Sequence, residues 1–188
     1  MVSRARPIQT KSRRLASRAY LMDPKQSLGV SSNIFLVGIE ADDFDATVRT
    51  AVDIDDSSEH PDELSDMGSI QFYGAPESKR DTFEKMTEGD LVLFHQNGEY
   101  VGTGWIGTTF EDSDLWASST VWSNTSTPLI YTIEDFIPVA VPASAVNRIF
   151  DYADGYSPPK FMRVAGKRVT NSTKAISRAL QQYSEKHD

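Results

Sequence analysis

The order of short apolar runs along the chain predicts a domain of the α+β class. Runs rich in β-branched and aromatic residues are typical of buried strands, and they lie at 33–39, 69–74, 91–94 and 128–142. Short helical patterns separate these runs, but strands and helices do not alternate regularly as they do in a parallel βαβ sheet. The clearest element is a β-hairpin, because Gln96-Asn97-Gly98 is a tight turn that leads into a second strand over 100–109.

Helices are expected in the first half of the chain between these strands. Asp43 is the predicted N-cap of a helix in which Phe44, Val48 and Val52 recur every four residues. A second helix and turn is expected over 75–90, where apolar residues recur three apart on one face.

The second half of the chain is expected to end on a helix. Pro138 and Pro142 confine the apolar run 128–142 to a sheet edge or to breaks in a strand. A short helix over 143–152, a loop and a last short strand follow, and Asn171 or Ser172 is the expected N-cap of a terminal helix.

Length and composition predict one folded domain with extensions. The sequence has 188 residues, and we divide it into a basic N-terminal extension (1–30), a folded domain (31–170) and a C-terminal helix or linker (171–188). Cysteine is absent, which excludes disulfides, thiol chemistry and the commonest zinc ligands. There is no apolar run of membrane-spanning length and no signal peptide, so we expect a cytoplasmic protein without a membrane partner.

Charge is divided unevenly along the chain, whose net charge is −8. Residues 1–22 and 160–178 each carry six Lys or Arg and no acid, whereas residues 31–159 carry 24 acids and five bases. The acidic middle is unsuited to a polyanion and is either a solvated face or the general acidity of a halophilic protein. The basic ends could hold phosphates, or they could be basic tails.

The glycines of "GTGWIG" at 102–107 fit the G-x-G-x-x-G pattern of dinucleotide-binding enzymes. That site requires the motif to open a helix whose N-terminus holds the pyrophosphate. Here two threonines, a phenylalanine and two acids follow instead. We therefore expect Gly102, Gly104 and Gly107 to be places where a curved strand bends or approaches another group closely.

No motif in the sequence argues for catalysis. His60, His95 and His187 are scattered, and neither a metal-binding histidine pair, a nucleophile elbow nor a P-loop is present. We predict no catalytic residue, metal or cofactor for this chain.

Aromatic residues gather in the middle of the sequence. Trp105, Trp116, Trp122, Tyr131 and Phe136 fall within 32 residues. Two interpretations are open: each ring packs into the core, or two or three of them line a cage that stacks on a planar or methylated ligand.

Residues 71–106, "QFYGAPESKRDTFEKMTEGDLVLFHQNGEYVGTGWI", resemble the core motif of the PUA-like superfamily, especially its EVE branch. The matching residues are Tyr73, Gly74, Met86, Gly89, Asp90, Phe94, Val101, Gly102, Gly104 and Ile106. The stretch 33–52 resembles the first strand and helix of the related YTH branch, and 130–142 resembles its later strand. The resemblance covers roughly residues 33–165.

The resemblance implies a fold and a function. The expected fold is an α+β PUA-like (EVE/YTH-type) curved β-barrel of about five or six strands with peripheral helices. Members of this superfamily read nucleic-acid bases, often modified, that are flipped into an aromatic pocket. Such domains occur as specificity modules joined to HNH or other nuclease domains, and the acidic composition resembles that of proteins from haloarchaea and their viruses.

Pocket residues are carried over by position. Asp45 matches the YTH position that faces the adenine edge, Phe136 matches a YTH cage Trp, and Tyr73 takes the place of the EVE pocket aromatic. The YTH cage Trp after the first helix is missing, so we expect Trp116 or Trp122 to supply that wall, with Trp105 nearby. The residues expected to hold the phosphate backbone are Arg13, Arg14, Arg163, Lys167, Arg168 and Lys174.

The leading hypothesis is a non-catalytic reader of methylated double-stranded DNA. The base is N6-methyladenine in the first place and 5-methylcytosine in the second, and a covalently linked nuclease domain supplies catalysis. The alternatives are an RNA-binding PUA-like or YTH module and a stand-alone enzyme or small-molecule binder on the same barrel.

Overall fold

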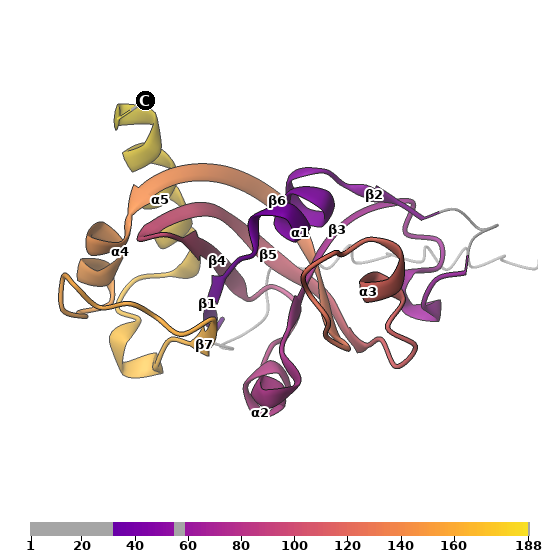
Figure 1. Ribbon diagram of the computed structural model, residues 1–188. Helices are drawn as coiled ribbons and strands as arrows, with labels where there is room; N and C mark the ends of the chain where they lie inside the picture. Colours follow the sequence, from indigo (N-terminus) through magenta and orange to yellow (C-terminus); the bar gives the residue numbers. More distant parts are fainter. Residues whose placement is uncertain (1–31, 55–58, 188) are drawn as a thin grey trace, which may run out of the picture. The chain divides into compact units, whose positions relative to one another are not determined.

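The structure, a computed structural model, describes residues 32–54 and 59–187 of the 188-residue chain (Figure 1). One seven-stranded sheet has the order β2-β3-β6-β5-β4-β1-β7. Its strands are β1 Ile34–Gly38, β2 Val52–Asp53, β3 Ser69–Ala75, β4 Leu91–Gln96, β5 Glu99–Glu111, β6 Leu129–Pro142 and β7 Phe161–Arg163. The α+β class is confirmed, with seven strands rather than five or six and with no ladder that closes the sheet within the described residues.

Short helices flank this sheet on two sides. They are α1 Ala41–Phe44, the π-helix η1 Asp45–Arg49, the 3₁₀ turns η2 Asp62–Leu64, η3 Glu77–Lys79 and η4 Gly166–Arg168, and the helices α2 Arg80–Phe83, α3 Trp116–Thr120, α4 Ala143–Ile149 and α5 Thr173–His187. In Figure 1, α4 and α5 lie to the left of the long strands β5 and β6, whereas α1 and α3 lie to the right. None of the helices in the described ranges has the length and apolarity that crossing a membrane requires.

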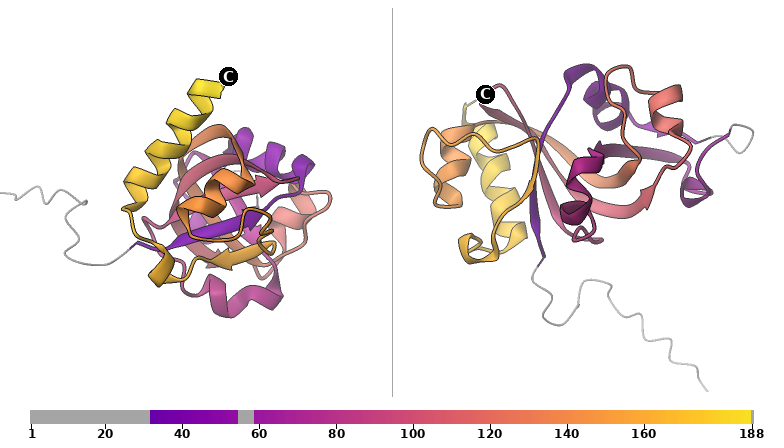
Figure 2. Two further views of the ribbon diagram at one scale, coloured as in Figure 1. Left: turned by 90° about the vertical axis from the view of Figure 1, so that its left-hand side faces the viewer. Right: turned by 60° about the horizontal axis from the view of Figure 1, so that its bottom comes forward.

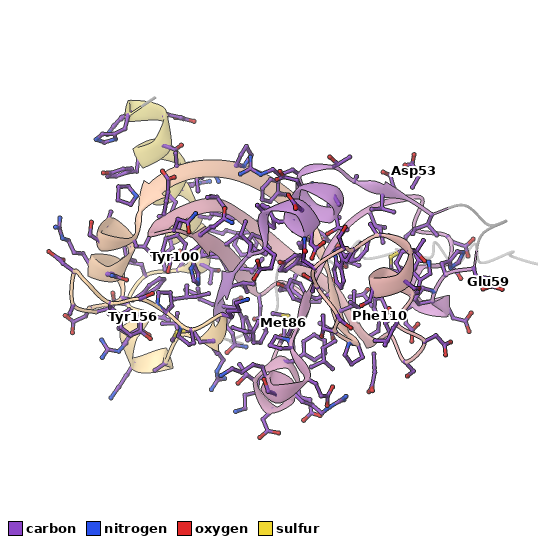
Figure 3. All side chains as sticks on the ribbon, viewed as in Figure 1. Asp53, Glu59, Met86, Tyr100, Phe110 and Tyr156 are labelled. Carbon is purple, nitrogen blue, oxygen red and sulfur yellow. The ribbon has the colours of Figure 1, made fainter. Side chains whose placement is uncertain are left out.

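The sheet buries both of its faces, and a separate core lies on each. We call these the first core, which contains Phe35, Val37, Val92 and Phe94, and the second core, which contains Ile34, Leu36, Leu91 and Leu93. Because alternate residues of a strand face opposite sides, β1 and β4 are apolar at every position of their doubly buried parts, 34–37 and 91–94. This double burial explains the unbroken apolar runs in the sequence. In Figure 3, Tyr100 marks the second core, and Met86 and Phe110 mark the first.

Strand β6 changes faces at a bulge. Trp105 pairs with Glu134 and Thr103 pairs with Ile137, so two residues of β6 lie opposite one residue of β5. Asp135, at the bulge, has a φ of 48°. The extra residue shifts the alternation by one. As a result, Ile133 packs in the first core and Ile137 packs against the second.

The position of Pro138 in β6 agrees with the expectation that prolines lie at a sheet edge or at a break in a strand. Strand β3 pairs with β6 over 129–133. Among the described residues, β5 is therefore the only ladder partner of the part of β6 that contains Pro138. A proline in such a position removes no second ladder of hydrogen bonds.

The terminal helix α5 packs on the sheet. Ser172 caps it by accepting a hydrogen bond from the N–H of Ala175 at 3.2 Å, as predicted. Ile176 and Leu180 are buried in the second core, and Ser184 accepts the N–H of Ala140 at 3.0 Å. Figure 2 shows α5 and α4 from two further sides. The role of 171–188 as a linker toward a further domain stays a prediction.

The predicted cap at Asp43 is wrong. Helix α1 begins at Ala41 with Glu40 as its N-cap residue, so Asp43 lies inside the helix. Phe44 and Val48 are buried on one face as predicted, but Val52 belongs to β2. The carboxylate of Asp43 accepts the N–H groups of Ser123 and Asn124, 80 and 81 residues away, and is therefore not available for capping.

The glycines of strand β5 permit close crossing of β6. A Cβ at Gly102 would lie 2.7 Å from Cζ of Phe136, and one at Gly104 would lie 2.5 Å from Cγ2 of Ile133. Both glycines are inside β5 rather than at the start of a helix. The close-approach interpretation is confirmed, and the dinucleotide interpretation fails because no helix N-terminus follows.

Replacing Gly102 by alanine is expected to lower the free energy of unfolding by about 1–3 kcal/mol, because the ring of Phe136 must move out of its place. Urea denaturation measures the change. Gly166→Ala is the matched control, since nothing lies within 4 Å of its added Cβ, and surface changes of this kind stay within about 0.5 kcal/mol. Equal stability of the two variants would contradict the packing argument.

Candidate functional site

Seven aromatic rings pack together in the first core, and we call them the aromatic cluster. Its members are Phe44, Phe72, Tyr73, Phe94, Trp116, Trp122 and Phe136. They come from α1, β3, β4, β6, α3 and the segment after α3, so five separate stretches of sequence meet here. Neighbouring ring centroids are 4.9–6.3 Å apart, in the tilted and edge-on arrangements that aromatic pairs prefer.

Trp122 is the most tightly held ring contributed by the loop between β5 and β6. It is 5% exposed, and its Nε1–H donates to Oγ1 of Thr47 at 3.2 Å. Its ring lies 5.4 Å from Phe72 and 5.8 Å from Tyr73. Gly74 makes this position possible, because a Cβ there would be 2.9 Å from the indole ring.

Tyr73 joins strand β3 to the start of α1. Its hydroxyl accepts the N–H of Glu40 at 3.0 Å, and its ring meets Phe44 edge-on at 5.8 Å. Burial raises the pKa of Tyr73, so the phenol stays protonated at neutral pH.

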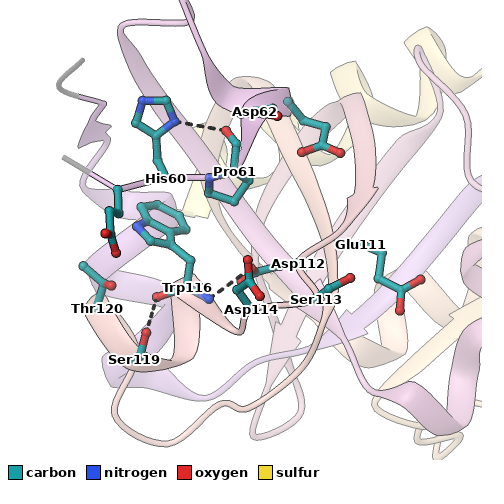
Figure 4. Close-up of a pocket in the computed structure, with 12 residues that line it drawn as sticks. His60, Pro61, Asp62, Glu111, Asp112, Ser113, Asp114, Trp116, Ser119 and Thr120 are labelled. Atoms are coloured by element: carbon teal, nitrogen blue, oxygen red, sulfur yellow. Dashed lines mark hydrogen bonds between the residues drawn. The ribbon is translucent and has the colours of Figure 1, made fainter. Parts of the chain in front are cut away.

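Trp116 lies at the border of the cluster with solvent. The half-buried ring is 5.6 Å from Phe72. Asp112 holds the start of α3 by accepting the N–H groups of Trp116 and Ala117, each at 3.0 Å. The other side of Trp116 faces a hollow of about 880 Å³, shown in Figure 4. Carboxylates dominate its lining, namely Glu59, Asp62, Glu63, Glu111, Asp112 and Asp114.

Phe136 closes the cluster on the side of the β6 bulge. Its half-buried ring lies over Gly102 and is 5.8 Å from Phe44 and 6.3 Å from Phe94. Four of the six predicted pocket residues therefore meet in one cluster, and they are Tyr73, Trp116, Trp122 and Phe136.

The structure does not bring Trp105 or Asp45 into this cluster. Trp105 packs against the second core, on the opposite face of the sheet, because its neighbour Ile106 takes the inward position in the first core. Asp45 lies in η1 with its side chain 62% exposed, and it forms an ion pair with Arg49 at 3.0 Å. Their predicted roles in a pocket have no support from these contacts.

Comparisons with known proteins agree with this architecture. No family model and no curated protein matches the sequence. Among solved structures, the chain is similar to the N-terminal domain of McrB from Thermococcus gammatolerans, determined bound to m5C DNA. The TM-score is 0.62 at 19% identity, over 79% of this chain and 99% of that chain. The chain therefore shares the fold of that McrB domain. At this identity the likeness concerns the fold, and the predicted fold class is confirmed.

The domain also contains a buried carboxylate that was predicted only as a helix cap. Asp43 is 1% exposed and accepts the N–H of Ser123 at 2.8 Å and that of Asn124 at 3.1 Å. Burial alone would raise the pKa of Asp43, but the hydrogen bonds from residues 123–125 lower it below its ordinary value. An ionised carboxylate therefore lies against residues 123–125, the segment that directly follows Trp122.

No sequence signal identifies Asp43 as the buried acid. Asp43 precedes Thr47 by four residues, so the two share a face of the helix, and the hydroxyl of Thr47 donates to the carbonyl of Asp43 at 3.1 Å. Nothing in the spacing of "EADDFD" reveals which of its acids meets residues 80 positions away.

The predicted phosphate-binding residues of the described chain lie on β7, η4 and the first turn of α5. Arg163, Lys167 and Lys174 are exposed, and Arg163 donates to Oδ1 of Asn33 at 3.2 Å. Arg168 is different, because it is half-buried over the ring of Tyr152 at 4.4 Å and donates to the carbonyl of Phe150 at 3.1 Å. Arg13 and Arg14 lie outside the described residues.

Metal chemistry has no candidate ligand set here. Within residues 32–54 and 59–187, no group of three or more His, Asp or Glu side chains is placed to hold an ion. The site brings together mutually packed aromatic rings, of which Trp116 and Phe136 are half-buried, and a carboxylate that accepts backbone N–H groups.

Proposed function

We propose that this chain is a non-catalytic domain that recognises a methylated base in double-stranded DNA. The observation that carries the proposal is the aromatic cluster built beside the ionised, buried carboxylate of Asp43. The PUA-like fold supports it, since a structural neighbour with this fold was determined bound to m5C DNA.

Stacking and hydrogen bonding can offset the cost of flipping a base. Extrusion from the duplex costs a few kcal/mol, and stacking on an aromatic ring returns about 1–3 kcal/mol for each base. A buried methyl group adds about 0.8 kcal/mol. Selectivity for a methyl group is therefore modest unless aromatic rings enclose it. The proposed rings are Trp116, Trp122 and Tyr73, after the segment that carries Trp122 has moved away from Tyr73.

The carboxylate of Asp43 is the proposed reader of the base edge, in place of Asp45. In this structure the N–H groups of Ser123 and Asn124 occupy it. An exocyclic N–H of the base can take their place if the segment 121–127, which carries Trp122, moves away from η1. N6-methyladenine and 5-methylcytosine both retain such an N–H. We place N6-methyladenine first, and the m5C DNA of the neighbour makes 5-methylcytosine the second base to test.

Charge indicates which surface faces the DNA backbone. The exposed basic residues Arg163, Lys167 and Lys174 can neutralise phosphates. The acidic hollow beside Trp116 repels them. We propose that the backbone follows the basic stretch 160–178 and avoids the hollow.

The proposed context is a modification-dependent restriction endonuclease. This domain would supply specificity, and a covalently linked nuclease domain, of the HNH or another class, would supply cleavage. The proposed cellular compartment is the cytoplasm, where such an enzyme meets foreign DNA.

A duplex containing N6-methyladenine or 5-methylcytosine is expected to bind at least about threefold more tightly than the unmodified duplex, which is the effect of about 0.8 kcal/mol from one buried methyl. Competition gel shifts with otherwise identical duplexes measure the ratio. Repeating them at several salt concentrations counts phosphate contacts, because each contact adds about 0.9 to the slope.

Three outcomes would overturn the proposal. Equal affinity for modified and unmodified duplexes would exclude methyl recognition. Preference for RNA of the same sequence would favour an RNA-binding module. Turnover of nucleic acid by this chain alone with a divalent metal would make it an enzyme.

A further inference from the structure

A second hollow, which we call the hairpin pocket, lies on the opposite side of the sheet from the aromatic cluster. It encloses about 340 Å³ and is lined by His95, Gly98 and Tyr100 of the β4–β5 hairpin, by 142–144 and by 154–158. Tyr100 belongs to the second core, whereas the cluster belongs to the first. The volume is at the lower end of the range for small-molecule sites, about 300–1,000 Å³.

Two polar atoms in this lining have no hydrogen-bond partner within the described part of the chain. Tyr100 is 0% exposed and its hydroxyl is unpaired, and the same is true of the buried Nε2 of His95. The two residues face each other across the hairpin, with ring centroids 5.4 Å apart. Buried polar groups in folded proteins are almost always paired with protein, water or ligand atoms, so two such groups in one hollow point to a bound partner there.

The imidazole of His95 and the phenol of Tyr100 are both neutral near pH 7. Burial lowers the pKa of His95, and a hydrogen bond to the carbonyl of Pro159 only partly opposes this. Because a carbonyl needs an N–H donor, the other ring nitrogen, Nε2, is left as an acceptor in the neutral ring. Burial raises the pKa of Tyr100, with Tyr152 and Tyr156 adding to the effect. The pocket thus offers one acceptor and one hydroxyl that can donate or accept.

The outer wall of the pocket is held in place by its own contacts. The amide nitrogen of Asn147 lies 3.2, 3.1 and 2.9 Å from the carbonyls of Ala153, Asp154 and Tyr156. Tyr156 stacks on Tyr152 at 4.3 Å and donates to Sδ of Met162 at 3.4 Å. A pocket formed in advance loses little conformational entropy when it binds a ligand. In Figure 3, Tyr100 and Tyr156 lie on the same side of the domain as α4.

Charge and shape define the class of ligand. The lining contains no Lys or Arg, and its single carboxylate, Asp154, is paired with Arg148 at 3.1 Å. Phosphates, carboxylates and zwitterionic amino acids would therefore find no opposite charge in the pocket, so their binding is disfavoured. Tyrosine and proline rings, by contrast, suit a flat uncharged ring with a polar edge.

We propose that the hairpin pocket binds one uncharged planar heterocycle of nucleobase size, with Tyr100 and His95 bonding its edge. The heterocycle is either a free nucleoside or a base in a nucleic-acid strand. A strand is physically reasonable, because the basic stretch 160–178 begins two residues after the lining residue Pro158. This site goes beyond the proposed function, since it uses neither the aromatic cluster nor Asp43.

Titration calorimetry with adenosine, cytidine, thymidine and N6-methyladenosine tests the pocket. At least one nucleoside is expected to bind the wild-type protein saturably, and Tyr100→Phe is expected to bind it about tenfold more weakly. Tyr131→Phe is the matched control, because it also removes one buried, unpaired hydroxyl but lies in the first core. Its affinity is expected to equal that of wild type.

A second variant and a second probe complete the test. Ser144→Trp is expected to fill the pocket and abolish binding, with a thermal melt showing that the protein is folded. A single-stranded oligonucleotide is the second probe. If it binds the wild-type protein, loses about tenfold in affinity in Tyr100→Phe, and free nucleosides do not bind, the occupant of the site is a base within a strand. No saturable binding of any probe, or equal binding by Tyr100→Phe, would overturn the proposal. Methyl-selective duplex binding in Tyr100→Phe would show that the function proposed for the aromatic cluster stands independently.

Discussion

Replacing Trp122 by alanine is expected to lower the free energy of unfolding by about 3–5 kcal/mol, a large fraction of the 5–15 kcal/mol typical of a domain. The indole is 5% exposed, contacts Phe72 and Tyr73, and bonds Thr47. Its removal leaves a cavity at the centre of the aromatic cluster. Urea denaturation followed by far-UV circular dichroism measures the loss, and a change below about 1 kcal/mol would contradict the burial of this ring.

The variant Trp116→Ala tests the contribution of one ring to DNA binding with a smaller effect on the free energy of unfolding. This ring is half-buried at the edge of the cluster, so its removal costs less stability than that of Trp122. If Trp116 stacks on the base, affinity for methylated DNA is expected to fall by about five- to 150-fold, the equivalent of 1–3 kcal/mol. An unchanged affinity for the methylated duplex would exclude Trp116 from the proposed cage. Trp105→Ala, on the other face, is the control for a nonspecific effect of losing a tryptophan.

Replacing Asp43 by asparagine is expected to cost about 2–3 kcal/mol of stability, because hydrogen bonds to a charged acceptor contribute about 1.5–3 kcal/mol. The carboxylate accepts the N–H groups of Ser123 and Asn124, and an amide can place only one acceptor oxygen there. Asp45→Asn is the matched control, since its side chain is 62% exposed and its ion pair with Arg49 is on the surface.

The effect of Asp43 depends on pH with a definite sign. The folded-state pKa is lower than the ordinary value of 3.8, because hydrogen bonds from 123–125 outweigh the opposing effect of burial. A carboxyl with a lowered pKa stabilises the fold fully above its unfolded pKa and loses this effect as the pH falls through the folded pKa. The stability gap between wild type and Asp43→Asn is therefore expected to be constant from pH 7 to about 5 and to narrow below about 4. A gap that widens in acid would contradict this assignment.

The elements that were predicted correctly have local causes. Asn97 and Gly98 have φ values of 51° and 81°, which is what an Asn-Gly hairpin turn requires. The predicted runs 33–39 and 91–94 contain the parts of β1 and β4 that are buried on both faces, and such a segment has no polar position. Ser172 caps α5 through a contact that spans three residues.

The parts of the site that were not predicted depend on contacts across the fold. Asp43 and Asp45 are two residues apart, yet the first reaches the loop at 123–124 and the second points to solvent. Trp105 and Phe136 are both aromatic residues of long strands, but a one-residue bulge and the alternation of β5 place them in different cores. Composition and spacing carry no information on such pairings.

The sequence by itself determined the hairpin, the strand runs, the division of charge and the α+β class, because these follow from propensity and periodicity within a few residues. Only the tertiary structure decided which rings meet, which acid is buried and which hydroxyls lack partners. Those outcomes depend on strand register and on the face that each side chain occupies, and a shift of one residue would reverse them.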